Sequence, residues 1–203
     1  MGKFFLKIFH FPRHLKKMFY KRWNKIKFWL CGISYGKGLN VMNFVYIEKE
    51  GNSSISIGDS FSIISGDALN PLVRNCMACL HTEDGAEITI GNHSGLSGAV
   101  LWAKESISIG NNVKIGANSI ILDNDAHSID FRIRRTDADC FSCKSAPIVI
   151  EDDVLIGTNT IVLKGVRIGA RTIIGGGSVV TKSIPADSIA AGNPCKVIRK
   201  LCN

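Results

Sequence analysis

The side chains best suited to chemistry lie in a polar segment, residues 123 to 147, which shows no regular hydrophobic pattern. His127 stands near its start, just after Asp123 and Asp125. Because imidazole titrates near neutral pH, His127 could act as a general base toward a weakly nucleophilic hydroxyl. Asp123 or Asp125 could orient the ring and stabilise its charged form, although acids in an exposed loop are also often simply solvated.

The cysteines offer a second kind of chemistry. An odd number without disulfide-framework spacing predicts free thiols, and the seven are Cys31, Cys76, Cys79, Cys140, Cys143, Cys195 and Cys202. Cys76/Cys79 and Cys140/Cys143 form two C-x-x-C pairs that could in principle share a structural zinc ion. Their wide separation, and the apolar neighbours of the first pair, favour buried or loop thiols, so no metal site is expected. A thiolate at Cys140 or Cys143 could instead carry an acyl group.

A six-residue period must position these side chains. From Ile150 onward an aliphatic or small residue recurs at every sixth position, namely Ile150, Ile156, Val162, Ile168, Ile174, Val180 and Ala186. The same phase occurs at Ile109, Ile115 and Ile121, and more loosely at Ile57 and Ile90. Neither a helix nor an ordinary strand keeps such a period, so a solenoid of short parallel strands is predicted.

In the hexapeptide-repeat solution, three hexads make one triangular coil, so Ile150, Ile168 and Ala186 should stack along one edge with their side chains inside the prism. Burying each repeated aliphatic side chain contributes roughly 1.5 to 3 kcal/mol before conformational entropy is subtracted. Gly and Asn suit the corners because they adopt positive φ at low cost.

The period defines three regions. Residues 1–47 are predicted to form a basic, aromatic, helical segment, and residues 48–192 an all-β solenoid with an excursion loop at 123–147. Residues 193–203 should form a tail that includes a short helix, from Lys196 to Leu201. A long excursion from a regular solenoid is more often functional than accidental.

Two segments carry a family resemblance: ISIGNNVKIGANSIILDNDAH, residues 107–127, and IGTNTIVLKGVRIGARTIIGGGSVVTKSIPADSIAAGNPCKVIRK, residues 156–200. The combination of GGGSVVTK, AAGNPCKVIRK and an upstream loop histidine resembles the hexapeptide-repeat acetyltransferases of the galactoside, maltose and virginiamycin branch. The resemblance implies a left-handed parallel β-helix that works as a homotrimer. It also implies direct acetyl transfer from acetyl-CoA, with His127 as the general base.

The resemblance further assigns a binding site for acetyl-CoA, the co-substrate. Small residues should line the pantetheine arm, backbone N–H groups near residues 175–177 should meet the thioester carbonyl, and polar or basic residues should contact the phosphates. These cofactor-binding candidates are Thr158, Gly176, Thr181, Lys182, Lys196 and Arg199.

The acceptor is less determined than the cofactor. An acceptor-binding asparagine of the family has no clear counterpart, so Ser97 and Asp125 are the substrate-binding candidates, and Leu155 stands where the family commonly has tryptophan. The basic N-terminus resembles acetyltransferases of cell-surface polysaccharide assembly, which predicts a sugar or glycan acceptor. Serine, an amino-sugar nitrogen and an antibiotic hydroxyl are the alternatives.

The positive charge is concentrated at the N-terminus. Residues 1 to 47 hold ten Lys and Arg residues, no acid and twelve of the sixteen aromatic residues. This composition suits an anionic membrane surface or packing on the protein itself, and it fits nucleic acid less well. No apolar run is long enough to span a bilayer, and no cleavage signal is recognisable, so we expect a cytoplasmic protein, and one at the inner face of the membrane if the basic segment binds lipid instead of packing on the protein.

Two other functional classes use similar solenoids. A zinc-dependent carbonic anhydrase needs three histidine ligands, for which His81, His93 and His127 are the candidates, but they show no suitable close pair. A non-catalytic scaffold would have no need for the glycine run, the excursion histidine and the basic tail together. Both classes are therefore disfavoured.

Overall fold

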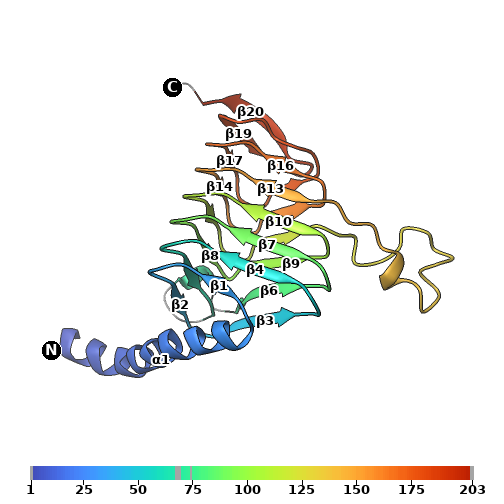
Figure 1. The fold of residues 1–203 in the computed structure, drawn as a ribbon. Helices are drawn as coiled ribbons and strands as arrows, with labels where there is room; N and C mark the ends of the chain where they lie inside the picture. The colour runs from blue at the N-terminus through green and yellow to red at the C-terminus, as the bar shows by residue number, and fades with distance from the viewer. Residues whose placement is uncertain (1, 67–69, 74, 202–203) are drawn as a thin grey trace.

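A computed structural model describes residues 2–66, 70–73 and 75–201, and the side chains in this range except those of residues 2–11, 13 and 14. The chain forms one helix, α1 (Gly2–Leu30), followed by parallel strands stacked into a three-sided prism (Figure 1). As far as the last coil, each strand pairs in parallel with the strand one coil further along the chain. The sequence thus correctly predicted a parallel β-helix built on a six-residue period, and the left-handed sense of its coils stays a prediction.

Three sheets make up the sides of the prism. Sheet A contains β1 (Ser34–Tyr35), β4 (Ser54–Ile57), β7 (Glu87–Ile90), β10 (Ser106–Ile109), β13 (Ile148–Ile150) and β16 (Arg167–Ile168). Sheet B contains β2 (Asn40–Met42), β5 (Ser62–Ile64), β8 (Gly95–Ser97), β11 (Lys114–Ile115), β14 (Leu155–Ile156), β17 (Ile173–Ile174), β19 (Ser188–Ala191) and β20 (Lys196–Lys200). Sheet C contains β3 (Val45–Lys49), β6 (Ala78–Thr82), β9 (Val100–Ala103), β12 (Ile120–Leu122), β15 (Ile161–Leu163) and β18 (Val179–Val180).

The core is the column of aliphatic side chains inside the prism. Ile150, Ile156, Val162, Ile168 and Val180 are all at most 1% exposed, as the period predicts. The corners also follow the prediction, since asparagines at positions 112, 118 and 159 have positive φ. Burial of the repeated residues therefore explains both the period and the regular stacking of the coils.

The last coil departs from the period. Ala186 does not stack on Ile168, because Ile184 forms the bridge to Ile168 instead, and Ala190 pairs with Ile174. The corner after β18 is thus shorter than a full hexad would make it. This part of the prediction is wrong, and Ile184, which is 4% exposed, fills the core in place of Ala186.

The C-terminal tail is also different from the prediction. Residues 196 to 200 form strand β20, which pairs antiparallel with β19, rather than a helix. Without β20, β19 would be the unpaired edge strand of sheet B, and an edge strand readily pairs with an extended segment. Pairing satisfies backbone groups that a short exposed helix would have left open at that edge.

Helix α1 ends at Leu30, so it covers only part of the segment expected to be helical, and residues 31 to 47 already contribute β1, β2 and the start of β3. Figure 1 shows α1 lying across the first coil. Asn24 and Phe28 are fully buried there, and the Asn24 side chain donates to the Asn43 carbonyl at 2.8 Å. The helix closes the N-terminal end of the core. In the described residues, no helix is apolar enough over sufficient length to cross a membrane.

Two segments interrupt the coils. The first lies between β5 and β6, where the described residues include a short 3-10 helix, η1 (Pro71–Val73). Residues 123 to 147 leave between β12 and β13, include η2 (Cys140–Ser142), and project sideways from the prism in Figure 1. The second excursion leaves from the edge where sheet C ends and sheet A begins.

Candidate active site

The base of the excursion is fixed by a buried carboxylate. Asp123 is fully buried and accepts hydrogen bonds from the backbone N–H groups of Lys104, at 2.7 Å, and Glu105, at 2.8 Å. Burial raises the pKa of Asp123, although these N–H donors oppose the rise. The two arms of the loop are also bridged between Asn124 and Ser145. Asp123 therefore anchors the loop, and its carboxylate bonds to these backbone groups instead of to His127.

Asp125 ties the excursion to the next coil. Its carboxylate forms a short ion pair with Lys164, which follows β15, and its backbone N–H donates to the Lys144 carbonyl at 3.0 Å. Its own carbonyl accepts from the His127 N–H at 2.6 Å. Asp125 thus positions the backbone that carries His127, while its carboxylate faces the lysine.

A different acid contacts the histidine ring. The Nδ1 atom of His127 lies 2.6 Å from Oδ2 of Asp139, across the width of the loop. The other oxygen, Oδ1, accepts from the Ser128 N–H at 2.7 Å. The Ser128 N–H and then the contact with His127 hold the pKa of Asp139 below its usual range, so it is a carboxylate at neutral pH.

This contact leaves the other ring nitrogen of His127 available. The His127 side chain is 63% exposed, whereas that of Asp139 is only 16% exposed. A carboxylate on Nδ1 favours the tautomer with its proton on that atom, so that Nε2 can accept a proton. His127 and Asp139 form a base–orienter pair at the exposed part of the excursion. Sequence reasoning missed Asp139, which lies twelve residues away from His127.

Two cofactor candidates meet at another edge. Thr158 follows β14 and Gly176 follows β17, so both lie where sheet B passes into sheet C. A Cβ on Gly176 would lie 3.0 Å from the Thr158 carbonyl oxygen, which shows how closely the coils stack. Among the described residues, the N–H groups of Gly175 and Gly177 are bonded to carbonyls of adjacent coils, but no partner is found for the N–H of Gly176.

The basic cofactor candidates are exposed near the last coils. Thr181 and Lys182 follow β18 where sheet C ends, and Lys196 and Arg199 lie on β20. Lys196 is the first residue of β20 and lies beside the corner that carries Gly176. The backbone N–H of the preceding residue, Cys195, fixes this position by donating to the Val179 carbonyl at 2.8 Å. Thr158, Gly176 and Lys196 are thus arranged about one edge, whereas Thr181 and Lys182 lie at the next.

Ser97, the acceptor candidate, ends β8 at the same edge as Thr158, two coils nearer the N-terminus. It pairs in register with Ile64 and is half-buried. His127 leaves the prism from the opposite side of sheet C. A single chain therefore separates His127 from Ser97, Thr158 and Gly176 by the width of that sheet.

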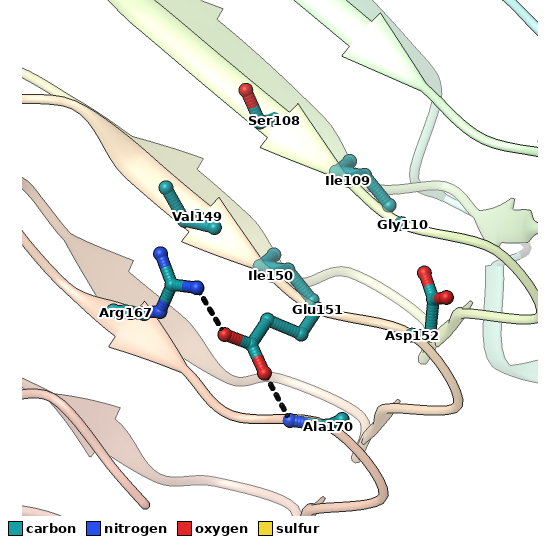
Figure 2. A pocket seen from close by; sticks show the side chains of 9 residues that line it. All are labelled: Ser108, Ile109, Gly110, Val149, Ile150, Glu151, Asp152, Arg167 and Ala170. Atoms are coloured by element: carbon teal, nitrogen blue, oxygen red, sulfur yellow. Dashed lines mark hydrogen bonds and ion pairs between the residues drawn. The ribbon is translucent and has the colours of Figure 1, made fainter. Parts of the chain in front are cut away.

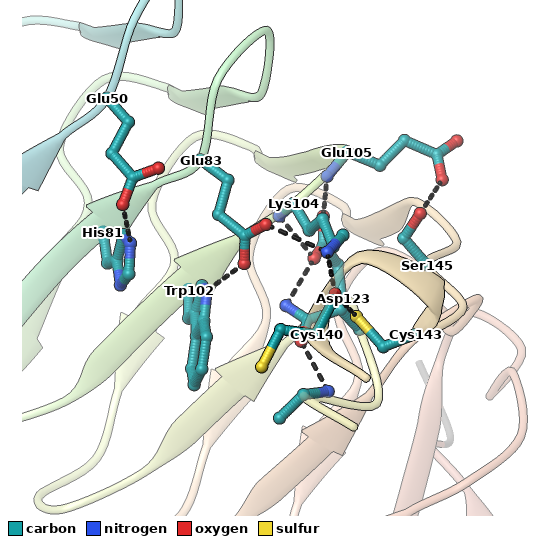
Figure 3. Close-up of polar contacts among 12 residues, drawn as sticks. Glu50, His81, Glu83, Trp102, Lys104, Glu105, Asp123, Cys140, Cys143 and Ser145 are labelled. Atoms are coloured by element: carbon teal, nitrogen blue, oxygen red, sulfur yellow. Dashed lines mark hydrogen bonds and ion pairs between the residues drawn. The ribbon is translucent and has the colours of Figure 1, made fainter. Parts of the chain in front are cut away.

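The outer face of sheet C carries a polar network beside the excursion (Figure 3). The rings of His81 and Trp102 stack at 5.2 Å, and the Trp102 indole donates to Glu83 at 3.0 Å. Lys104 pairs with Glu83 at 3.1 Å and donates to the Cys140 carbonyl at 2.8 Å. The network links the body of the solenoid to the far arm of the excursion.

The cysteines lie in different parts of the structure. The described ones, Cys31, Cys76, Cys79, Cys140, Cys143 and Cys195, are free thiols, while Cys202 lies outside the described residues. The two C-x-x-C pairs do not gather into a four-thiol group in the part of the chain that the structure covers. Burial raises the pKa of Cys79 to about 11, so its thiol is protonated at neutral pH.

An open pocket lies on the outer face of sheet A. Figure 2 shows Glu151 between Arg167, with which it forms a short ion pair, and the Ala170 N–H, which donates at 2.7 Å. Ser108, Val149 and Asp152 are among the other residues that line it. No residue predicted from the sequence to act in catalysis or binding lines this pocket, and its Glu151 carboxylate is already paired with Arg167 and the Ala170 N–H.

Two protein-family models match the solenoid. The bacterial transferase hexapeptide model, with six repeats, matches residues 147–182, and the model for the hexapeptide repeat of succinyl-transferase matches residues 106–122. The matched segments include the coils on both sides of the excursion. They confirm the resemblance to hexapeptide-repeat transferases that the sequence motifs indicated.

Individual relatives are acetyltransferases. One is a hexapeptide-repeat acetyltransferase from Vibrio cholerae O1 biovar eltor, whose structure was solved with acetyl coenzyme A. Its sequence is 37% identical to this chain, the match covers 61% of this chain and 65% of that one, and the TM-score is 0.54. Another is a maltose O-acetyltransferase from Clostridium difficile 630, which is 27% identical. That match covers 84% of this chain and 70% of the other, with a TM-score of 0.54.

A third relative, the 2,3,4,5-tetrahydropyridine-2,6-dicarboxylate N-acetyltransferase of Staphylococcus aureus strain Newman, is 51% identical over 55 residues, 27% of this chain and 23% of that protein. This chain spans less than half the length of these curated relatives, 44% of a Schizosaccharomyces pombe acetyltransferase and 23% of the Staphylococcus aureus enzyme.

Proposed function

We propose that this protein is an acyl-CoA-dependent O-acetyltransferase that moves the acetyl group of acetyl-CoA to a sugar hydroxyl, in the assembly of a cell-surface polysaccharide. The observation that carries the proposal is the His127–Asp139 pair, exposed on an excursion from a hexapeptide-repeat solenoid. The Vibrio cholerae relative solved with acetyl coenzyme A supports acetyl-CoA as the co-substrate.

The reaction follows from the free nitrogen of His127. Nε2 takes the proton of the acceptor hydroxyl while its oxygen attacks the thioester carbonyl of acetyl-CoA. The Gly176 N–H, which lacks a partner among the described residues, is suited to stabilise the negative charge that develops on that carbonyl oxygen. When the C–S bond breaks, the imidazolium returns the proton to the thiolate of CoA. The products are the acetyl ester and free CoA.

The active site requires more than one chain under this proposal. His127 leaves the prism at one edge of sheet C, and Thr158 and Gly176 lie at the other. The excursion also exposes apolar side chains, with Phe141 87% and Ile129 70% exposed. A neighbouring subunit that packs its excursion against the Thr158 edge would cover them. A homotrimer closed about the solenoid axis provides three such sites.

Subunit mixing tests this arrangement. Co-expressed His127→Ala and Thr158→Trp chains, each inactive alone, should regain about one quarter of wild-type activity per site, because one random pairing in four unites both intact halves. Sedimentation should show a trimer. No recovery in mixed trimers, or an active monomer, would contradict a site shared between subunits.

The acceptor can be tested directly. Thermal stabilisation by a panel of acyl-CoAs should identify acetyl-CoA, after which CoA release is followed with candidate glycans. An O-acetyl product loses its acetyl group in mild base, whereas an N-acetyl product does not. Transfer to a nitrogen is the second candidate function, supported by the identity to the Staphylococcus aureus N-acetyltransferase. A base-stable product would favour it over the sugar hydroxyl.

The exposed face of α1 supports peripheral contact with an anionic membrane. Met18 is 64%, Phe19 60% and Trp29 73% exposed, among lysines and arginines on the same helix. Removing the whole helix is a poor test, because Phe28 closes the core. Phe19→Ser with Trp29→Ser should instead reduce sedimentation with phosphatidylserine vesicles and leave acetyl-CoA binding intact. Unchanged vesicle binding would refute the membrane role.

A further inference from the structure

The excursion brings together three side chains that are good ligands for zinc. One ligand atom from each of His127, Asp139 and Cys140 lies within 4.8 Å of the other two. In the described ranges, this is the group of three that meets that criterion. The set offers nitrogen, oxygen and sulfur, which zinc accepts as a borderline-soft ion, and it is not a cluster of acids alone.

The distances are close to those of a metal site. Zinc bonds of about 2.0 to 2.3 Å in tetrahedral geometry place neighbouring ligand atoms roughly 3.3 to 3.6 Å apart. The His127 Nδ1 and Asp139 Oδ2 atoms, now 2.6 Å apart, would separate by less than about 1 Å. Oδ1 of Asp139 is already held by the Ser128 N–H at 2.7 Å, as the outer atom of a metal-bound carboxylate commonly is.

We propose that Zn²⁺ binds His127, Asp139 and Cys140, and that the bound ion switches off His127 as a base. The ion takes the place of the proton between Nδ1 and Oδ2, and the Cys140 thiol loses its proton to solvent. The proton displaced from Nδ1 moves through solvent to Nε2, so the metal-bound ring stays neutral. That nitrogen then donates a hydrogen bond and no longer accepts a proton from the acceptor hydroxyl.

The surroundings allow such an ion to enter. The His127 side chain is 63% exposed and Cys140 is exposed, so water can reach the group and fill a fourth position on zinc. Lys104 lies near, with its Nζ 2.8 Å from the Cys140 carbonyl oxygen, but Glu83 pairs with it at 3.1 Å. The nearby positive charge is therefore partly balanced.

Cobalt titration of the full-length, chelator-treated protein, without acyl-CoA, tests the site. Co²⁺ should give a sulfur-to-cobalt charge-transfer band and the intense visible absorption of a tetrahedral ion. Cys140→Ser should abolish the charge-transfer band, and His127→Ala, which removes a direct ligand, should weaken binding by at least about 10-fold to 100-fold, the usual cost of losing only an outer partner of a ligand. Cys143→Ser is the matched control and should keep both. An unchanged band and affinity in Cys140→Ser would overturn the proposal.

The effect on catalysis rests on the proposed function, and it is measured separately. Zn²⁺ should lower the initial rate of acetyl transfer and EDTA should restore it. Each variant is compared with its own rate in EDTA, and the fractional inhibition of Cys140→Ser should be much smaller than that of Cys143→Ser. Equal inhibition of the two would refute the switch. If no acetyl transfer is found at all, the cobalt spectrum still decides whether the metal site exists.

Discussion

Replacing Asp139 by asparagine isolates the role of the acid that holds His127. The amide oxygen can still accept from the Ser128 N–H, so the loop should keep its shape. The amide nitrogen, however, would donate to Nδ1 and favour the tautomer with the proton on Nε2. That atom could then no longer take the proton of the acceptor.

The structure sets the size of this effect. In a well-buried Asp–His pair the same change lowers kcat by about 10⁴-fold. Here the His127 side chain is 63% exposed, so the ring can turn and solvent can partly replace the lost partner. We therefore expect kcat to fall by roughly 10² to 10³, with little change in KM for acetyl-CoA.

The assay is steady-state CoA release in the presence of EDTA, which keeps adventitious metal from His127. Asp125→Asn is the matched control, because it removes a neighbouring carboxylate that faces Lys164 instead of the ring. Its kcat should change far less than that of Asp139→Asn. Comparable losses in the two variants would show that loop position, not the ring contact, limits the rate.

Three further substitutions and one labelling experiment have definite expected outcomes. Leu101→Ala empties a fully buried core position and should lower the free energy of unfolding by about 2 to 5 kcal/mol in urea titrations with an unchanged m-value. Lys182→Ala should raise KM for acetyl-CoA with a smaller effect on kcat in steady-state assays. The pKa of Cys79, about 11, predicts that in mass-spectrometric labelling at pH 8 it reacts with iodoacetamide at least tenfold more slowly than a free cysteine. Arg171 holds the pKa of the Asp187 carboxyl below its usual value of 3.8, so the pair stabilises the fold at pH values above 3.8. This stabilisation should be lost as the pH falls through the lower pKa of folded Asp187. In thermal melts, the Tm difference between wild type and Asp187→Asn should therefore shrink over that pH range.

The sequence predicted the solenoid because its period reports directly which side chains point inward. Ile121 and Ile150, on either side of the excursion, are both at most 1% exposed, so the interruption could be located from the pattern alone. The pattern failed where a corner changed length. Ile184 occupies the position expected for Ala186, and a period cannot reveal a two-residue shortening that occurs at its own end.

The candidate site was less predictable, because its contacts cross a loop without regular structure. Asp123 and Asp125 are the acids nearest to His127 in the sequence, yet Asp139 contacts the ring. A compact loop folds back on itself, so sequence distance is a poor guide to contact within it. The one-turn 3-10 helix that follows Asp139 gave no signal strong enough to choose this acid over its neighbours.

The excursion combines a fixed base with an exposed far end, and this division suits both proposed roles. Asp123, fully buried, and the bridge from Asn124 to Ser145 fix where the loop leaves the prism. Beyond them, His127 is held through Asp139 and keeps one face open to solvent. A base that must reach an acceptor beside a neighbouring chain needs this exposure, and the same exposure admits a metal ion. If both proposals hold, the contact that makes His127 a base is therefore also the contact through which zinc would silence it.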